Sequence, residues 1–158
     1  MLIEATMGTK AQCHVCGKRG RLFGPRISVC PGCEKEVCDA CAKQSGWTVM
    51  TGTDHMTDYQ DRAVCSEECA FNAYTKHLPR LVAREDVQLA NEDNVSVGVY
   101  DREGGGGFGI SIAYRHIDAG AWSSRDHMAP QASAMYERIK ADLGSRSVKY
   151  AEIFESII

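Results

Sequence analysis

The chain has 158 residues, a formal net charge of −3 and eight cysteines, all of which fall between Cys13 and Cys69. This length indicates one ordinary domain or two small ones, and the abrupt end of the cysteines separates two regions with different means of stabilisation. Eight thiolates holding two zinc ions would add four negative charges, which argues against a general binder of nucleic acid.

The N-terminal residues carry no signal for export or membrane insertion. Glu4 stands early in the chain, and no basic patch is followed by a long apolar run, as a secretory signal requires. No apolar stretch approaches the ~20 residues that a membrane-spanning helix needs. We therefore expect a cytoplasmic protein whose thiols stay reduced and available to a metal ion.

The cysteines come in four closely spaced pairs, and this pattern predicts two metal sites. A Cys-x-x-Cys turn supplies two thiolates to one zinc ion, and a second pair completes the tetrahedron. Since eight cysteines leave none over, we expect two closed Zn2+ sites of the structural kind, without an open position for water. The pairs are Cys13/Cys16, Cys30/Cys33, Cys38/Cys41 and Cys65/Cys69.

Three other roles for these cysteines are disfavoured. Disulfides need an oxidising compartment, and nothing in the sequence indicates export. A redox-active Cys-x-x-Cys needs one pair beside a helix, not four pairs in a short segment. Iron–sulfur clusters use four cysteines each with a spacing of their own.

The residues around the cysteines favour tight turns and one helix. Gly17 suits the chain reversal after the first pair, and Pro31 and Gly32 form a turn dipeptide within the second. Ser66 is a good N-cap for a helix that carries Cys69 in its first turn and ends before Pro79. A pair on a turn combined with a pair on a helix is the treble-clef arrangement.

Spacing alone does not decide which pairs share an ion. Five Cα steps between Cys33 and Cys38 reach at most ~16–18 Å, which allows two sequential beads or an interleaved cross-brace. The order C-x2-C-x13-C-x2-C-x4-C-x2-C-x23-C-x3-C resembles the FYVE, PHD and RING group over residues 13–77, and the all-cysteine set is nearest to FYVE. The resemblance implies interleaved ligation, with one ion on Cys13, Cys16, Cys38 and Cys41 and the other on Cys30, Cys33, Cys65 and Cys69.

The lipid-binding residues of the FYVE family have no full match in this chain. Where that family has a basic run with two histidines, this sequence reads Arg-Ile-Ser-Val-Cys at 26–30, and Arg-Ala-Val-Cys at 62–65 is a stretched form of its Arg-Val-Cys segment. We therefore expect no specific phosphoinositide binding. We expect Arg26 and Arg62 to cover the negatively charged zinc–thiolate clusters instead.

A short hairpin and a second, longer one are expected next. Residues 45–52 form a β-like run in which Trp47 packs over the zinc core or serves as an anchor for a partner. Residues 80–94 have the composition of a connector. Alternating apolar positions in 95–99 and 108–114 predict a hairpin, and Gly104–Gly107 between them is expected to be a loose turn, because no strand–glycine–helix context supports a phosphate loop.

Two helices are expected at the C-terminal end. The first starts at Pro130, runs through Leu143 and stops at Gly144. The second is capped by Ser147 and has an apolar face that would complete the local core or dock a partner, including a second copy of the chain. This face consists of Tyr150, Ile153, Phe154, Ile157 and Ile158.

Four polar residues in the segment 113–128 are the candidates for a third metal site or a general base. They are His116, Asp118, Asp126 and His127. No predicted element positions them, so surface polar residues are the default interpretation.

The sequence thus predicts an α+β fold with a two-zinc treble-clef, cross-brace module at 10–79, a connector at 80–94 and a ββαα segment at 95–158. The leading functional hypothesis is a non-catalytic intracellular interaction module, an adaptor or regulator that recognises another protein. One alternative is nucleic-acid binding through the basic cluster Lys18–Arg26, with Lys10 beside it. Another is an enzyme, ubiquitin-ligase-like by analogy with RING or hydrolytic through the C-terminal loop.

Overall fold

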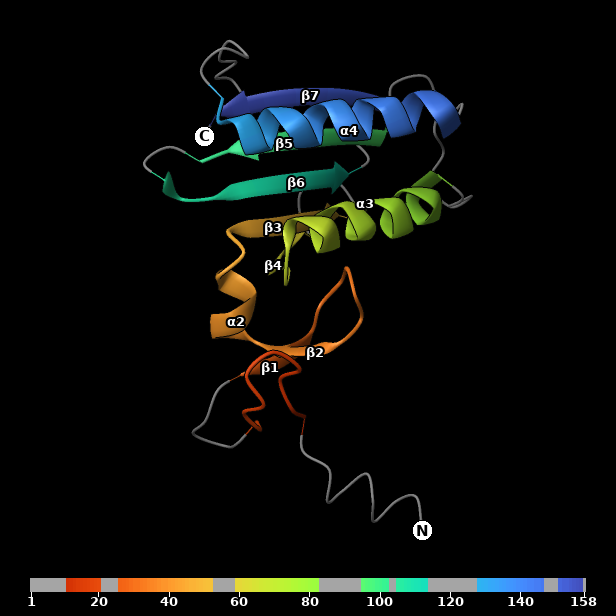
Figure 1. The fold of residues 1–158 in the computed structure, drawn as a ribbon. Coiled ribbons are helices and arrows are strands. Elements are labelled where there is room, and N and C mark those ends of the chain that lie inside the picture. The colour runs from red at the N-terminus through yellow and green to blue at the C-terminus, as the bar shows by residue number, and fades with distance from the viewer. Residues whose placement is uncertain are drawn as a thin grey trace.

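The computed structural model describes residues 11–20, 26–52, 59–82, 95–102, 105–113, 128–146 and 151–157. The fold is α+β, as predicted, and Figure 1 shows its arrangement. Within the described residues, none of the helices combines the length and the apolar character that a membrane crossing requires. The elements are β1 (Ile27–Val29), β2 (Glu36–Cys38), α2 (Asp39–Lys43), β3 (Trp47–Gly52), β4 (Tyr59–Ala63), α3 (Glu67–Val82), β5 (Val95–Asp101), β6 (Phe108–Ala113), α4 (Pro130–Arg146) and β7 (Ala151–Ile157).

The strands form two separate sheets. β1 and β2 make a small antiparallel pair beside the cysteine turns, and the other strands make one five-stranded sheet in the order β4-β3-β6-β5-β7. In this sheet β3 runs antiparallel to β4 and parallel to β6, while β5 runs antiparallel to β6 and parallel to β7. Helices α3 and α4 lie side by side on one face of the sheet (Figure 1). The result is a two-layer body with the small sheet and the cysteine turns at one end.

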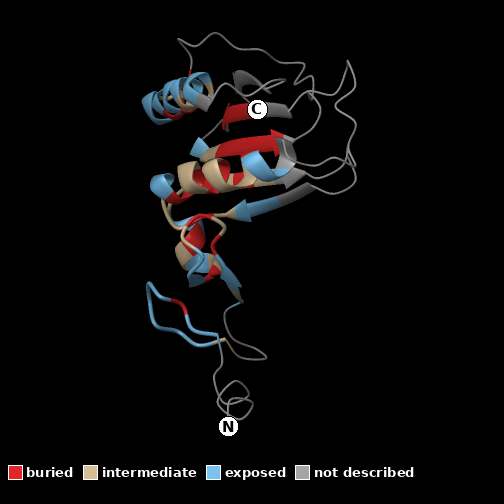
Figure 2. Ribbon diagram, turned by 90° about the vertical axis from the view of Figure 1, so that its right-hand side faces the viewer, coloured by how far each residue is buried: buried red, intermediate tan, exposed pale blue. Residues whose placement is uncertain are grey.

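The main core lies between the helices and the central strands. Val49 on β3 pairs with Ile110 on β6, which pairs with Val99 on β5, so one apolar row crosses the three strands. All three side chains are buried. The buried colour runs through the middle of the five-stranded sheet in Figure 2. Tyr74 and Leu78 of α3 are also fully buried and complete the core from the helical side. The alternation predicted for the second hairpin therefore reflects a sheet with one face against helices.

The five-stranded sheet joins the cysteine-rich region to the cysteine-free region. Trp47, at the start of β3, is 3% exposed, and its ring centroid lies 5.0 Å from that of Phe108 at the start of β6. It therefore packs in the junction and is not an exposed anchor. Gly107 has φ +93°, and a Cβ there would collide with the carbonyl of Gly46. This last glycine of the Gly104–Gly107 run is thus required where the two regions meet.

The predicted second C-terminal helix is wrong. Residues 151–157 form β7, which pairs in parallel with β5 along its whole length. A short apolar run fits a helix or a strand, and here the unpaired edge of β5 decides, because it offers main-chain hydrogen bonds that the isolated segment lacks. The C-terminal segment is therefore ββαβ instead of ββαα, and the helix expected to support self-association does not exist.

Two predicted helix ends are also wrong. Helix α3 continues through Pro79 to Val82, and α4 continues past Gly144 to Arg146. Proline costs a helix one hydrogen bond, but burial of Leu78 immediately before it holds this turn against the sheet. The connector expected at 80–94 therefore begins inside α3, and its remaining residues 83–94 lie outside the described residues.

Candidate metal centres

The eight cysteines gather into two clusters of four. In each, the sulfur atoms all lie within 4.8 Å of one another, so each cluster could hold a metal ion. None of the cysteines forms a disulfide. The pairs are used in interleaved order, as the FYVE, PHD and RING resemblance implies and the spacing left open. Cluster 1 consists of Cys13, Cys16, Cys38 and Cys41, and cluster 2 consists of Cys30, Cys33, Cys65 and Cys69.

Cluster 1 joins the first cysteine turn to the end of β2. Gly17, at φ +77°, reverses the chain, and its N–H donates to the carbonyl of Cys13 at 2.9 Å. The N–H of His14 donates to the carbonyl of Glu36 on β2 at 2.8 Å, which ties the turn to the strand. Cys38 stands at the end of β2, and Cys41 lies within α2. The hydrogen bond between the first cysteine turn and β2 therefore brings the two cysteine pairs of cluster 1 close together.

Cluster 2 joins the turn after β1 to the start of α3. Ser66 is the N-cap that the sequence predicted, because its Oγ accepts a hydrogen bond from the N–H of Cys69 at 3.1 Å. Gly32 packs directly on the backbone of Cys69, and a Cβ there would collide with the Cys69 carbonyl. Lys76, two turns into α3, donates to the carbonyl of Gly32 at 2.6 Å. The turn and the helix are thus held together by a close backbone contact and a side-chain hydrogen bond as well as by the cluster.

The sulfur spacing fits tetrahedral zinc. The Sγ atoms of Cys16 and Cys38 are 3.8 Å apart, and those of Cys33 and Cys65 are 3.9 Å apart. Two sulfurs at ~2.3 Å from one zinc ion at tetrahedral corners would be separated by about 3.8 Å. A disulfide would bring them to ~2.05 Å. The donor set and the spacing therefore suit a four-thiolate zinc site in both clusters.

Each cluster readily holds one negative charge and resists more. Burial disfavours the charged form of Cys13, but hydrogen bonds from neighbouring backbone N–H groups outweigh it and lower the pKa of this thiol to about 6. At Cys30, too, burial disfavours the charged form, but backbone hydrogen bonds outweigh it and lower the pKa of the thiol to about 7. The hydrogen bond with Cys38, followed by burial, raises the pKa of Cys41 to about 12, and burial followed by the contact with Cys30 raises the pKa of Cys65. Four thiolates at one site therefore need a cation to offset their charge.

One residue links the two clusters, and sequence reasoning missed it. His14 stands between two cysteines of cluster 1, yet its Nε2 lies 3.3 Å from the Sγ of Cys65 in cluster 2. A metal-bound thiolate accepts hydrogen bonds, so the imidazole N–H would donate to it from outside the ligand set. The position of His14 inside the first Cys-x-x-Cys turn could have indicated a role near a metal site. Only the fold shows that its side chain lies against cluster 2.

Of the remaining predicted site residues, the structure brings together Arg26 and Arg62, which line one pocket. The side chain of Arg62 donates to the carbonyl of Val29, next to Cys30, at 2.6 Å, while Arg26 is exposed. Lys18 and Arg19 are exposed as well. Lys10 and Arg21 of the basic cluster lie outside the described residues, as do the four candidates of the C-terminal loop, His116, Asp118, Asp126 and His127.

Comparison with known proteins identifies no relative of this chain. No protein-family model, no curated protein and no solved structure matches the chain. The likeness to cross-brace zinc domains therefore rests on the order of the cysteines and on their interleaved grouping.

Proposed function

We propose that the protein is a zinc-stabilised interaction module, in which two structural Zn2+ ions hold a surface that recognises another protein. The observation that carries the proposal is the pair of closed four-sulfur clusters that together use every cysteine of the chain. Four protein ligands leave no position for water or substrate, which is the arrangement of structural and not catalytic zinc. The proposal places the protein in a reducing compartment such as the cytoplasm, where thiolates persist.

The surface we assign to the partner lies in the cysteine-rich region. Val15, at the tip of the first cysteine turn, is 56% exposed, and Val29 on β1 is 47% exposed. They are the large apolar side chains that stand out as exposed among the described residues. Lys18 and Arg19 follow Val15 and are exposed too. This combination suits a partner segment with an apolar side chain and acidic neighbours.

Affinity capture with the zinc-loaded full chain tests the proposal. Val15→Ser and Val29→Ser remove apolar contact area without introducing charge, and Gln131→Ser on the exposed side of α4 is the matched control. We expect the wild type and the control to retain the same protein from native cytosol, and the two valine variants to lose it.

Nuclease treatment of the cytosol separates the protein partner from the nucleic-acid alternative. Retention that survives nuclease supports the proposal, whereas retention that nuclease abolishes assigns the basic residues to nucleic acid. Equal retention by all four chains would refute the surface we assign. Native mass spectrometry of each chain should show two zinc ions, which excludes misfolding as the cause of a loss.

A further inference from the structure

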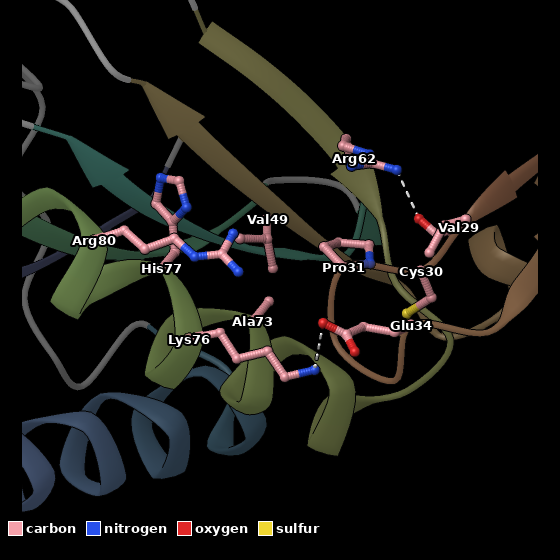
Figure 3. A pocket seen from close by; sticks show the side chains of 10 residues that line it. All are labelled: Val29, Cys30, Pro31, Glu34, Val49, Arg62, Ala73, Lys76, His77 and Arg80. Atoms are coloured by element: carbon pink, nitrogen blue, oxygen red, sulfur yellow. Dashed lines mark hydrogen bonds and ion pairs between the residues drawn. The ribbon is translucent and has the colours of Figure 1, made fainter.

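A cavity of 310 Å³ lies between α3, the strands β3 and β4, and the turn of cluster 2. Figure 3 shows its lining, to which α3 contributes one stripe of residues spaced three and four apart. Its size is at the small end of ligand-binding cavities, which run from ~300 to 1,000 Å³. The cavity borders cluster 2, because the turn of that cluster forms one wall and its Cys30 is among the lining residues.

Basic side chains outnumber acidic side chains in the lining of this cavity. Arg62, Lys76 and Arg80 line it together with a single acid, Glu34. The Nζ of Lys76 lies 3.6 Å from the Oε1 of Glu34. Arg62 donates to the neutral carbonyl of Val29 and forms no ion pair with any described residue. Arg80 is exposed and forms no ion pair with any described residue. Among the basic and acidic side chains of the lining there is therefore an excess of two positive charges, contributed by Arg62 and Arg80, beside Cys30 of cluster 2.

A buried polar atom of one lining residue has no hydrogen-bond partner among the described residues. The Nε2 of His77 is inaccessible to solvent and makes no hydrogen bond within the described part of the chain. Burial, followed by the nearby charge of Arg80, lowers the pKa of this imidazole, so it stays neutral and can donate one hydrogen bond or accept one. Buried polar groups are nearly always hydrogen-bonded, so an orphan atom on a residue that lines a cavity points to a bound group.

We propose that this cavity binds the phosphate group of a small soluble ligand. A phosphate monoester carries a charge of about −1.5 to −2 at pH 7, which matches the excess of two positive charges. Two guanidinium groups offer planar forks that suit its oxygens, and His77 supplies a further polar contact. Val49 and Ala73 form apolar wall beside these groups and accommodate the organic part of a monoester. This ligand site goes beyond the proposed recognition of a protein and does not depend on it.

A different role for the same bases is to balance the charge of cluster 2, since a zinc ion with four thiolates has two net negative charges. Lys76 is placed for that role, because it bonds to Gly32 in the cluster's own turn. Arg80 lies a full helical turn further along α3. A substitution at Arg80 therefore distinguishes ligand binding from charge balance.

Calorimetric titration of the zinc-loaded full chain tests the proposal with inorganic phosphate, phosphoserine and acetate. We expect Arg80→Gln to weaken phosphate and phosphoserine binding at least about tenfold, which corresponds to about 1.4 kcal/mol. Arg19→Gln, the same change at an exposed arginine outside the cavity, should leave the affinity unchanged. Acetate, a monoanion, should bind at least about tenfold more weakly than phosphate. Inorganic phosphate and phosphoserine together show whether the organic part contributes.

A direct readout on the wild type accompanies the titration. The imidazole nitrogen resonances of His77, assigned by their loss in His77→Met, should shift on addition of phosphate and not of acetate. No binding at millimolar phosphate, equal affinities of the Arg80 and Arg19 variants, or equal binding of acetate would each overturn the proposal. Loss of zinc from Arg80→Gln with unchanged phosphate affinity would assign Arg80 to charge balance. Val29 lines this cavity as well as the surface assigned to the partner, but it is unchanged in both arginine variants, so the capture of a protein partner is tested separately.

Discussion

Removal of one ligand from each cluster should have different consequences. Cys13 and Cys69 both belong to the buried core, but only Cys69 of these two lies on a helix that packs on the five-stranded sheet. Cys69 of cluster 2 lies in the first turn of α3, and the same helix carries Tyr74 and Leu78 at 0% and 1% exposure. Cys13 of cluster 1 lies in the first cysteine turn, which is hydrogen-bonded to β2 of the small two-stranded sheet. We therefore expect Cys13→Ser to act locally and Cys69→Ser to act globally.

The magnitude follows from what α3 contributes. Burial of a large apolar side chain is worth ~1.5–3 kcal/mol, so Tyr74 and Leu78 together represent about 3–6 kcal/mol. Small domains are stable by only ~5–15 kcal/mol, and a structural zinc site contributes ~10–16 kcal/mol in finger peptides. Loss of cluster 2 together with the packing of α3 should therefore exceed the stability of the whole sheet.

Hydrogen exchange resolved by residue is the assay, with native mass spectrometry to show one zinc ion left in each variant. In Cys13→Ser we expect amides of 11–20 and 36–38 to lose protection while β5, β6 and α4 keep it. In Cys69→Ser we expect protection to fall together in α3, β3, β6 and β5. If Cys69→Ser leaves β5, β6 and α4 at their native protection, the reasoning is refuted, and the predicted domain boundary near residue 80 describes two independently stable parts.

Three further predictions concern the junction, the link between the clusters and pH. Gly107→Ala should destabilise the protein in urea unfolding by clearly more than Gly105→Ala. Both glycines have positive φ, which alone costs ~1–2 kcal/mol, but only at Gly107 does a Cβ collide, whereas Gly105 faces open space; equal losses would contradict the close approach. His14→Ala should weaken zinc binding at cluster 2 by about 10–100-fold and that at cluster 1 much less, as measured by chelator competition, since its Nε2 contacts Cys65. An equal effect on both would reduce His14 to a packing residue. Acidification should release zinc, because binding displaces protons from thiols such as Cys41, whose pKa is raised to about 12. Affinity for zinc must then fall as the pH drops from 7 to 5, and a constant affinity, followed with a chromogenic chelator, would argue against thiolate ligation.

Local chemistry made the cysteine pairs, their turns and the helix N-cap predictable from the sequence. A Cys-x-x-Cys turn has few ways to place its sulfurs, and Ser66 can cap only the helix that follows it. The alternation of apolar residues around Val99 and Ile110 likewise predicted the second hairpin, because the period of two is a property of each strand by itself. The interleaved use of the pairs came from the resemblance to cross-brace domains, since spacing allowed both orders.

Contacts between distant segments were decided only by the tertiary structure. Residues 151–157 have a pattern that fits a helix or a strand, and the free edge of β5 made them a strand. Trp47 and Phe108 meet because β3 and β6 pair in parallel. The residues around either aromatic side chain do not predict this pairing. His77 and Arg80 share a cavity with the turn of cluster 2 for the same reason. The sequence alone determined which residues can bind metal and where turns and a helix cap form. The sheet determined that 151–157 became a strand and which segments lie together, because pairing and packing energies depend on neighbours that are far away along the chain.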